Sequence, residues 1–334
     1  MNSRTKVIFF SSLGLILLIL DTKTARIGIS EGIALCLNTL IPSLFPFCVL
    51  STLLTGNLTN QPMAILKPIC KFCRIPQGCE SLLLIGWLGG YPVGAQNVAA
   101  AHRSGVLSSE DAARMAIICN NPGPAFLFGI LGPIISGKHT VLLMWWILLC
   151  SSLLTAHLIP GGTSHEGSLP PHEVPSFPSA IRSGIASMAN ICANVMFMGM
   201  ILEFLTKWIP SGTSHVVTTL ICGILEVSNG CFLLPGIENP AVRCLVANAL
   251  LSFGGICVWM QTVSVCHNLD LKAYLKWKLV QSLLTFIMTA AIFLPRLLIP
   301  LLPILTGKIL LRHFGKIGVD FPKIMLYSSS KGKK

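Results

Sequence analysis

Residues 86–133 read GWLGGYPVGAQN (86–97), VAAAHRSGVLSSEDAAR (98–114) and MAIICNNPGPAFLFGILGP (115–133), and this stretch decides the fold. Its apolar flanks, 81–101 and 115–137, contain no Asp, Glu, Lys or Arg. Both flanks are rich in helix breakers, namely Gly86, Gly89, Gly90, Pro92 and Gly94 in the first and Pro122, Gly123, Pro124, Gly132 and Pro133 in the second. In lipid, broken helices persist only inside protein or beside a water-filled cavity, because unpaired backbone groups are costly there. Interrupted segments of this kind indicate a transporter-type site near the bilayer midplane.

The composition is that of a membrane protein. Hydrophobic residues make up 53% of the 334 residues and charged residues 11%, and the mean hydropathy is +0.74. Soluble domains average about 45–50% apolar and about 25% charged residues, so an ordinary soluble protein is excluded. We predict an all-α, multi-pass protein with about 8–10 membrane segments, some of them discontinuous or re-entrant.

The positive charge points to the bilayer rather than to nucleic acid. The net charge is +12, but the Lys and Arg residues lie between the apolar runs and in the C-terminal tail. Basic residues in such places orient a protein in the membrane and attract anionic headgroups. The lipid bilayer is therefore the expected partner, and the basic loops 67–74 and 272–278 are expected to face the cytoplasm.

A linker rich in Gly, Ser, Pro and His, 161–178, divides the chain into two halves. Before it we expect a short N-terminal span and loop (1–30) and a first membrane repeat (31–160). After it we expect a second membrane repeat (179–306) and a basic tail (307–334).

The second half repeats parts of the first. The pattern Gly-Ile-Ala…Asn…Phe of 32–45 recurs at 184–197. The matched positions are Asn38 and Asn190, Gly89 and Glu226, and Arg114 and Arg243. Two related, inverted repeats about 150 residues apart are typical of secondary transporters. Asn side chains at membrane depth need partners, so Asn38 and Asn190 are expected to face the bundle interior, at a site or in an interhelical hydrogen bond.

The polar groups at the breaks form the predicted solute site: Tyr91, Gln96, Asn97, Asn120, Asn121 and Gly123. A broken helix presents its half-helix N-terminus, with about half a positive charge, to a polar or anionic solute. The alternative is a kink packed tightly by structural breakers, which are Gly90, Pro92, Gly94, Pro122 and Pro124. Ser108 and Asp111 form a capping signal that starts a helix near Ser109, upstream of the second break.

Glu226 lies between apolar runs. An acid at this depth is either a proton or cation site that couples transport, or an ion-pair partner of Arg114 or Arg243. Of these two interpretations the ion pair is preferred.

Signals for catalysis, metals and cofactors are weak. The chain has no HExxH, G-x-S-x-G or Walker motif, so we expect no enzyme, no metal and no cofactor. Cys70, Cys73 and Cys79 include one CxxC, which alone favours reduced bystander thiols over a metal or redox site.

Three motifs carry a resemblance to a known family: PSLFPF (42–47), GYPVGA (90–95) and NNPGP (120–124). The chain resembles, over about 30–300, the sporulation integral membrane proteins of YlbJ type, which are grouped with the nucleoside-recognition (Gate) domain proteins. Gln96 stands where a Lys is expected in that family, and Pro122 where Ser is commoner, which puts an anion contact at Gln96 in doubt.

The resemblance implies a multi-pass protein of the bacterial cytoplasmic membrane that acts when the spore cortex or envelope is built, without naming a substrate. The function we expect is transporter-like: moving or gating a small polar or anionic solute by alternating access. One rival is a non-transporting scaffold for envelope assembly, with homo-oligomer or envelope partners. The other is an intramembrane enzyme, which would need Glu226, His157 or a cysteine at an aqueous cavity.

Overall fold

The computed structural model describes residues 3–58, 63–135, 137–162, 175–266 and 268–294, and these residues form helices and no strands. The all-α prediction is thus confirmed. Six helices in the described ranges are long and apolar enough to cross a membrane: Thr22–Leu54, Ser109–Ile134, Lys138–Leu158, Phe177–Thr206, Pro240–Val265 and Tyr274–Phe293. Shorter apolar helices span Val7–Leu20, Glu80–Gly89 and His215–Leu225. The protein is integral to a membrane. The 8–10 segments expected included discontinuous and re-entrant ones, and the six long and three shorter apolar helices of the described ranges fall within that number. The contacts described below lie within one compact unit, Met1–Thr289.

The chain begins with two helices and no intervening loop. Helix α1 (Ser3–Leu20) is followed at once by α2 (Thr22–Leu35), and Asp21 caps α2 by accepting from the Thr24 nitrogen at 3.1 Å. The prediction of a loop within residues 1–30 is therefore wrong. A π-helical turn, η1 (Cys36–Leu40), joins α2 to α3 (Ile41–Leu58). It forms just before Pro42, whose missing N–H disrupts the ordinary hydrogen-bond ladder.

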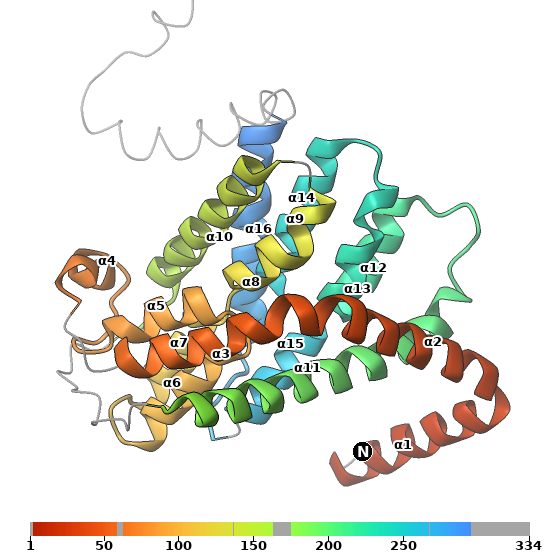
Figure 1. The fold of residues 1–334 in the computed structure, drawn as a ribbon, viewed down its shortest axis with the longest axis horizontal. Coiled ribbons are helices and arrows are strands. Elements are labelled where there is room, and N and C mark those ends of the chain that lie inside the picture. Colours follow the sequence, from red (N-terminus) through yellow and green to blue (C-terminus); the bar gives the residue numbers. More distant parts are fainter. Residues whose placement is uncertain (1–2, 59–62, 136, 163–174, 267, 295–334) are drawn as a thin grey trace, which may run out of the picture. The chain divides into compact units, whose positions relative to one another are not determined.

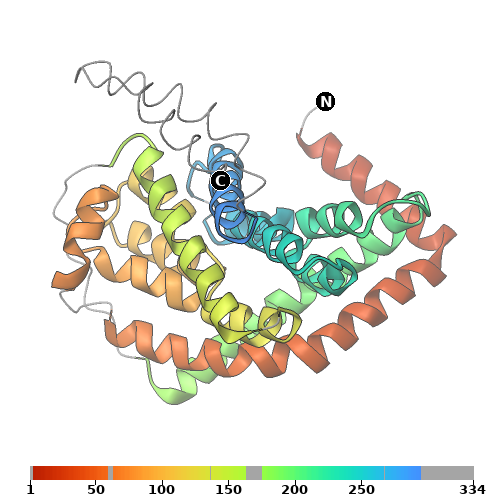
Figure 2. The same cartoon turned by 90° about the horizontal axis from the view of Figure 1, so that it is seen from above.

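Helix α2 packs along α11 (Phe177–Thr206), as Figures 1 and 2 both show for the red and green ribbons. The contact is made by small residues. A Cβ added to Gly28 would lie 2.7 Å from the Gly199 oxygen, and one added to Gly32 would lie 2.8 Å from the Met196 Cα. Such close approach of backbones is how helices associate where no hydrophobic driving force acts between them.

The same contact explains why the prediction for Asn38 and Asn190 is wrong, since both side chains are exposed. The buried residues along α2 and η1 include one at every fourth position: Gly28, Gly32, Cys36 and Leu40. The first three contact α11. Asn38 lies two residues from Cys36, about 200° around the helix, and so falls on the opposite face. Asn190 stands in the same relation to the buried Cys192 on α11.

The first half contains two interrupted helix pairs, as predicted. The first pair is α5 (Glu80–Gly89) and α6 (Val93–Arg103), preceded by η2 (Ala64–Leu66) and α4 (Lys67–Phe72). The second pair is α7 (Ser109–Cys119) and α8 (Pro124–Phe126), which continues through η3 (Leu127–Leu131) and α9 (Gly132–Ile134). Ser108 caps α7 as its sequence predicts, accepting from the Asp111 nitrogen at 3.0 Å. Helix α10 (Lys138–Leu158) completes this half.

The second half also contains interrupted helices. After α11 come α12 (His215–Leu225), α13 (Val227–Leu233), η4 (Leu234–Gly236), α14 (Pro240–Phe253), α15 (Gly255–Val265) and α16 (Tyr274–Phe293). The inverted repeat expected from the sequence stays a prediction. Most of the predicted linker, 163–174, and the whole basic tail, 307–334, lie outside the described residues.

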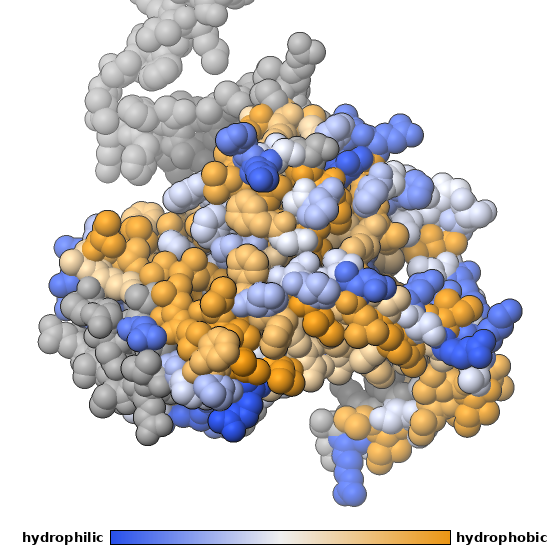
Figure 3. All heavy atoms as spheres, in the orientation of Figure 1, coloured by the Kyte–Doolittle hydropathy of each residue, from blue (hydrophilic) through white to orange (hydrophobic). Residues whose placement is uncertain are grey.

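Apolar side chains cover much of the face that Figure 3 shows, and hydrophilic ones gather toward its margins. Large exposed hydrophobic residues include Leu37 (60% exposed) on η1 and Leu50 (63% exposed) on α3. An apolar outer surface of this kind is suited to contact with lipid.

Candidate functional site

The two backbone breaks of the first half meet each other. Gly90 has a φ of +71°, and a Cβ there would lie 2.6 Å from the Gly123 nitrogen. In return, a Cβ on Gly123 would lie 3.0 Å from the Leu88 oxygen. Only glycine tolerates both the left-handed backbone and this proximity, so these glycines let the two breaks pack backbone to backbone.

The glycines flanking this contact have a packing role. A Cβ on Gly86 or on Gly94 would collide with the carbonyl oxygen of Cys119, at the end of α7. Pro124 begins α8, and Pro122 is buried in the extended segment before it. Close packing therefore accounts for Gly94, Pro122 and Pro124 without a solute.

The second half has a corresponding junction of breaks. Gly255 has a φ of +80°, and a Cβ there would lie 3.1 Å from the Gly223 oxygen in the last turn of α12. Helix α12 ends at Glu226, whose carboxylate caps α13. Its Oε1 accepts from the Ser228 nitrogen at 3.0 Å, and its Oε2 accepts from the Asn229 nitrogen at 2.7 Å and from the Asn229 Nδ2 at 3.0 Å.

The ion pair preferred for Glu226 does not form with either arginine. Arg114 donates to the carbonyl oxygens of Cys73, Arg74 (2.8 Å) and Ala156 (2.6 Å). Arg243 donates to the Ile237 oxygen from Nε at 3.0 Å and from Nη2 at 2.7 Å. Each guanidinium instead donates to backbone carbonyl oxygens, and its five N–H donors allow it to bond to several of them.

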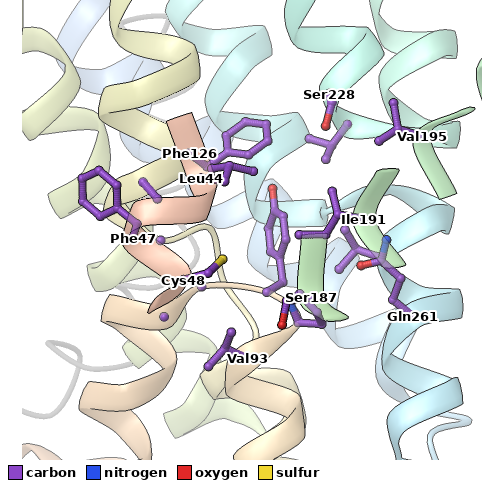
Figure 4. Close-up of a pocket in the computed structure, with 18 of the residues that line it drawn as sticks. Leu44, Phe47, Cys48, Val93, Phe126, Ser187, Ile191, Val195, Ser228 and Gln261 are labelled. Carbon is purple, nitrogen blue, oxygen red and sulfur yellow. The ribbon is translucent and has the colours of Figure 1, made fainter. Parts of the chain in front are cut away.

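A cavity of about 50 Å³ lies where these breaks approach α3, α11 and α15 (Figure 4). Its apolar wall includes Leu44, Phe47, Cys48, Val93, Phe126, Ile191 and Val195. Its polar lining consists of Tyr91, Ser187, Glu226, Ser228 and Gln261, with no Lys, Arg or His among the lining residues. Figure 4 shows Ser228 and Gln261 approaching from different sides with their polar ends turned inward.

Two polar groups of this lining stand out. The Glu226 residue is 2% exposed, and no cationic side chain of the described residues bonds to it. The Tyr91 hydroxyl is buried and has no hydrogen-bond partner among the described residues. Buried polar groups are normally satisfied, so the Tyr91 hydroxyl is a candidate for contact with a polar ligand, and the Glu226 carboxyl group lies in the same lining.

The structure divides the predicted solute residues. Tyr91 and Gly123 line the cavity together with the breakers Gly90 and Pro92. Gln96 and Asn97 are half-buried on α6 and do not line it, and Asn97 Nδ2 donates to its own helix at Val93 (2.9 Å).

Asn120 and Asn121 belong to a hydrogen-bond network on α16. Lys278 Nζ donates to the Asn120 carbonyl oxygen (2.9 Å), to Asn121 Oδ1 (3.1 Å) and to Gln281 Oε1 (2.9 Å). These three bonds use all three ammonium donors, and no acceptor is a carboxylate. Asn121 Oδ1 also accepts from Gln281 Nε2 at 2.6 Å, and Asn120 Nδ2 donates to the Tyr274 hydroxyl at 2.7 Å.

Lys278 was missed by the sequence reasoning, which assigned it to the basic loop 272–278. It is instead 1% exposed, because α16 begins at Tyr274. A signal for this was present in the sequence, where polar residues recur every three or four positions along a mostly apolar run: Tyr274, Lys278, Gln281, Thr285 and Thr289. That spacing places them on one helix face.

The three loop cysteines are buried free thiols. Burial raises the pKa of Cys70 and of Cys79 to about 12 and that of Cys73 to about 11. Thiols with such pKa values are protonated at neutral pH and react slowly. The described residues contain no group of three or more His, Cys, Asp and Glu placed to hold a metal ion.

A comparison with curated proteins shows one match. This chain is 31% identical over 100 residues to the sporulation integral membrane protein YlbJ of Bacillus subtilis (strain 168). The match takes in 29% of this chain and spans 24% of the relative's length. No family model matches the chain, and no solved structure matches it. The resemblance that the motifs indicate is confirmed over this part of the chain.

Proposed function

We propose that this protein is a transporter or gated permease for a small polar solute, moving it by alternating access around the broken helices. We further propose that it works in the bacterial cytoplasmic membrane during building of the spore cortex or envelope, on the strength of its similarity to a sporulation membrane protein. The observation that carries the transport proposal is the cavity at the helix breaks, with polar groups set in an apolar wall.

The position of the cavity supports this function. Broken helices that bring backbone and polar side chains to a cavity are the usual construction of solute sites in secondary transporters. Here the cavity joins the Gly90 and Gly123 breaks of the first half to the Glu226 break of the second. Movement of one half against the other would change access to the cavity.

The size of the cavity and the charges in its lining limit the class of solute that it can bind. One water needs roughly 10–15 Å³ of such space, so a cavity of about 50 Å³ holds a few waters or a small solute. The lining carries one carboxylate and no basic side chain, which disfavours an anion. We therefore propose a neutral polar or cationic solute, rather than the anionic one that the half-helix argument also allowed.

The test is solute uptake by the purified protein in liposomes, across panels of nucleosides, small amides, inorganic ions and cell-wall precursors. Ser187 lines the cavity, and Ser183, one turn away on α11, is exposed. Ser187→Met should fill the cavity and abolish uptake, while Ser183→Met should leave uptake near the wild-type rate. Uptake that survives Ser187→Met, or that is absent for every solute, would contradict the proposal.

A second candidate, a non-transporting scaffold for envelope assembly, is favoured by one observation. Asn120 and Asn121 are fully buried and bonded within the protein, as bracing residues would be. For a scaffold, the folded Ser187→Met variant would still support sporulation in cells. For a transporter, that variant would not. We propose no catalytic role in either case.

A further inference from the structure

We propose that the cavity at the helix breaks binds an alkali-metal cation, with the Glu226 carboxylate as its counter-charge and the Tyr91 hydroxyl as a second oxygen ligand. The inference deepens the proposed transport function, since such a cation would be the coupling ion. Binding itself is tested without any solute.

The first argument is the state of the Glu226 carboxylate. It accepts three N–H donors from Ser228 and Asn229, all between 2.7 and 3.0 Å. Donors of this kind favour the ionised form of a carboxylate, but the burial of Glu226 opposes ionisation more strongly, so the charged form needs a positive charge beside it. A buried ionised group is strongly unfavourable unless it is paired, and no cationic side chain of the described residues pairs with it. A cation in the adjoining cavity supplies the missing charge.

The second argument is independent of the first and comes from Tyr91. Its hydroxyl is buried without a hydrogen-bond partner in the described part of the chain, although the residue lines the same cavity as Glu226. A phenol oxygen has lone pairs that a cation can use. Ser228 and the Gln261 side-chain amide add further oxygen atoms to the lining.

The chemistry of the lining selects the class of cation. The candidate ligands are oxygen atoms, which suit hard cations rather than transition metals. Calcium and magnesium sites combine several carboxylates, or one or two carboxylates with phosphates, whereas this cavity has Glu226 alone. One carboxylate balances one positive charge. Helix α12 also ends at Glu226, and the C-terminal end of a helix favours positive charge.

The experiment measures binding of radioactive sodium to the purified protein in detergent, and thermal unfolding in sodium chloride against choline chloride at equal ionic strength. Sodium should bind saturably and raise the unfolding midpoint by several degrees, since a ligand stabilises the state that binds it. Glu226→Gln should abolish both effects. The control Glu203→Gln changes a half-buried acid on α11 that does not line the cavity, and it should keep both sodium effects.

Tyr91→Phe keeps the inference testable if Glu226→Gln fails to fold. It removes one atom that makes no hydrogen bond in the described residues, so stability in choline should not fall. The sodium affinity should fall about tenfold or more, as for loss of a metal-ligand interaction. Absence of saturable sodium binding, or a midpoint that responds to pH but not to sodium, would overturn the inference. Sodium binding without solute flux would support the cation site and contradict the transport proposal. Solute flux that does not depend on sodium would support transport and contradict the cation site.

Discussion

The two buried charges at the helix breaks are held in opposite ways. At the Asn120–Gly123 break, the charge is a cation that comes from α16, 157 or 158 positions away in sequence, and it binds only neutral acceptors. At the Glu226 break, the ionisable group is a carboxyl group that accepts hydrogen bonds from Ser228 and Asn229, two and three positions ahead in its own chain. Lys278 has every donor engaged, so it has none left for a ligand. Glu226 borders a cavity.

This contrast separates bracing from binding. A charge that crosses between distant helices fixes their relative position, and its loss leaves several buried partners unpaired. A charge that caps its own short helix contributes little to the rest of the bundle and remains available to a cation on its other side. The first-half break is therefore expected to matter for the fold, and the second-half break for the ligand.

The largest expected effect follows from removing the brace. Lys278→Ala leaves the acceptors on Asn120, Asn121 and Gln281 without this donor, and buried unpaired groups cost about 1–3 kcal/mol each. We expect the free energy of unfolding, measured by titration with a denaturing detergent, to fall by about 3 kcal/mol or more.

The matched control is Lys276→Ala, on the same helix but exposed. It should change the free energy of unfolding by less than about 0.5 kcal/mol. Equal losses for the two variants would remove the distinction between the breaks.

The next effect concerns the contact between the first-half breaks. Gly90 and Gly105 both have left-handed φ values, of +71° and +79°, but a Cβ on Gly105 meets nothing within 4 Å. Alanine at either position is strained by the positive φ, and more so at Gly90, whose ψ of −173° lies in a region essentially restricted to glycine. Only Gly90→Ala adds a clash with the Gly123 backbone. Thermal unfolding should therefore show a clearly larger loss for Gly90→Ala, and equal losses would mean that the two breaks are not in contact.

A smaller effect on stability is expected at the second-half break. Glu226→Gln keeps one side-chain oxygen to accept from the backbone of α13, so the free energy of unfolding should change by about 1 kcal/mol or less. The same detergent titration used for Lys278→Ala checks this. A loss as large as that of Lys278→Ala would show that Glu226 also braces the bundle.

The sequence predicted the local features of this fold well. The breakers around Gly90 and Pro122 interrupt helices where expected, and the Ser108 cap starts α7. Each of these depends on the backbone preferences of a few neighbouring residues, so a single sequence contains the information.

The pairing of distant groups could not be read in the same way. Asn120 and Asn121 were identified as important polar residues, but their partners lie on α16, and which helix meets a break depends on tertiary packing. The inward face expected for Asn38 and the ion pair preferred for Glu226 were wrong for the same reason. The face of a helix that turns inward is set by its neighbours, and an acid can accept its hydrogen bonds within its own cap instead of from an arginine.

The smallest expected effect is at the junction of α1 and α2, where Lys207 Nζ lies 2.5 Å from Asp21 Oδ2. The hydrogen bond from Lys207, with further bonds from Thr24, lowers the pKa of Asp21 from 3.8 to about 2. Because the pKa is depressed in the folded state, this stabilisation is complete above the unfolded value and is lost as the pH falls through about 2. Asp21→Asn should lower the thermal midpoint slightly at neutral pH, since both side chains are partly exposed. The difference from wild type should vanish in acid. An amide oxygen preserves the cap on Thr24, so a difference that persists unchanged at the lowest pH would mean that Asp21 acts through packing and not through its charge.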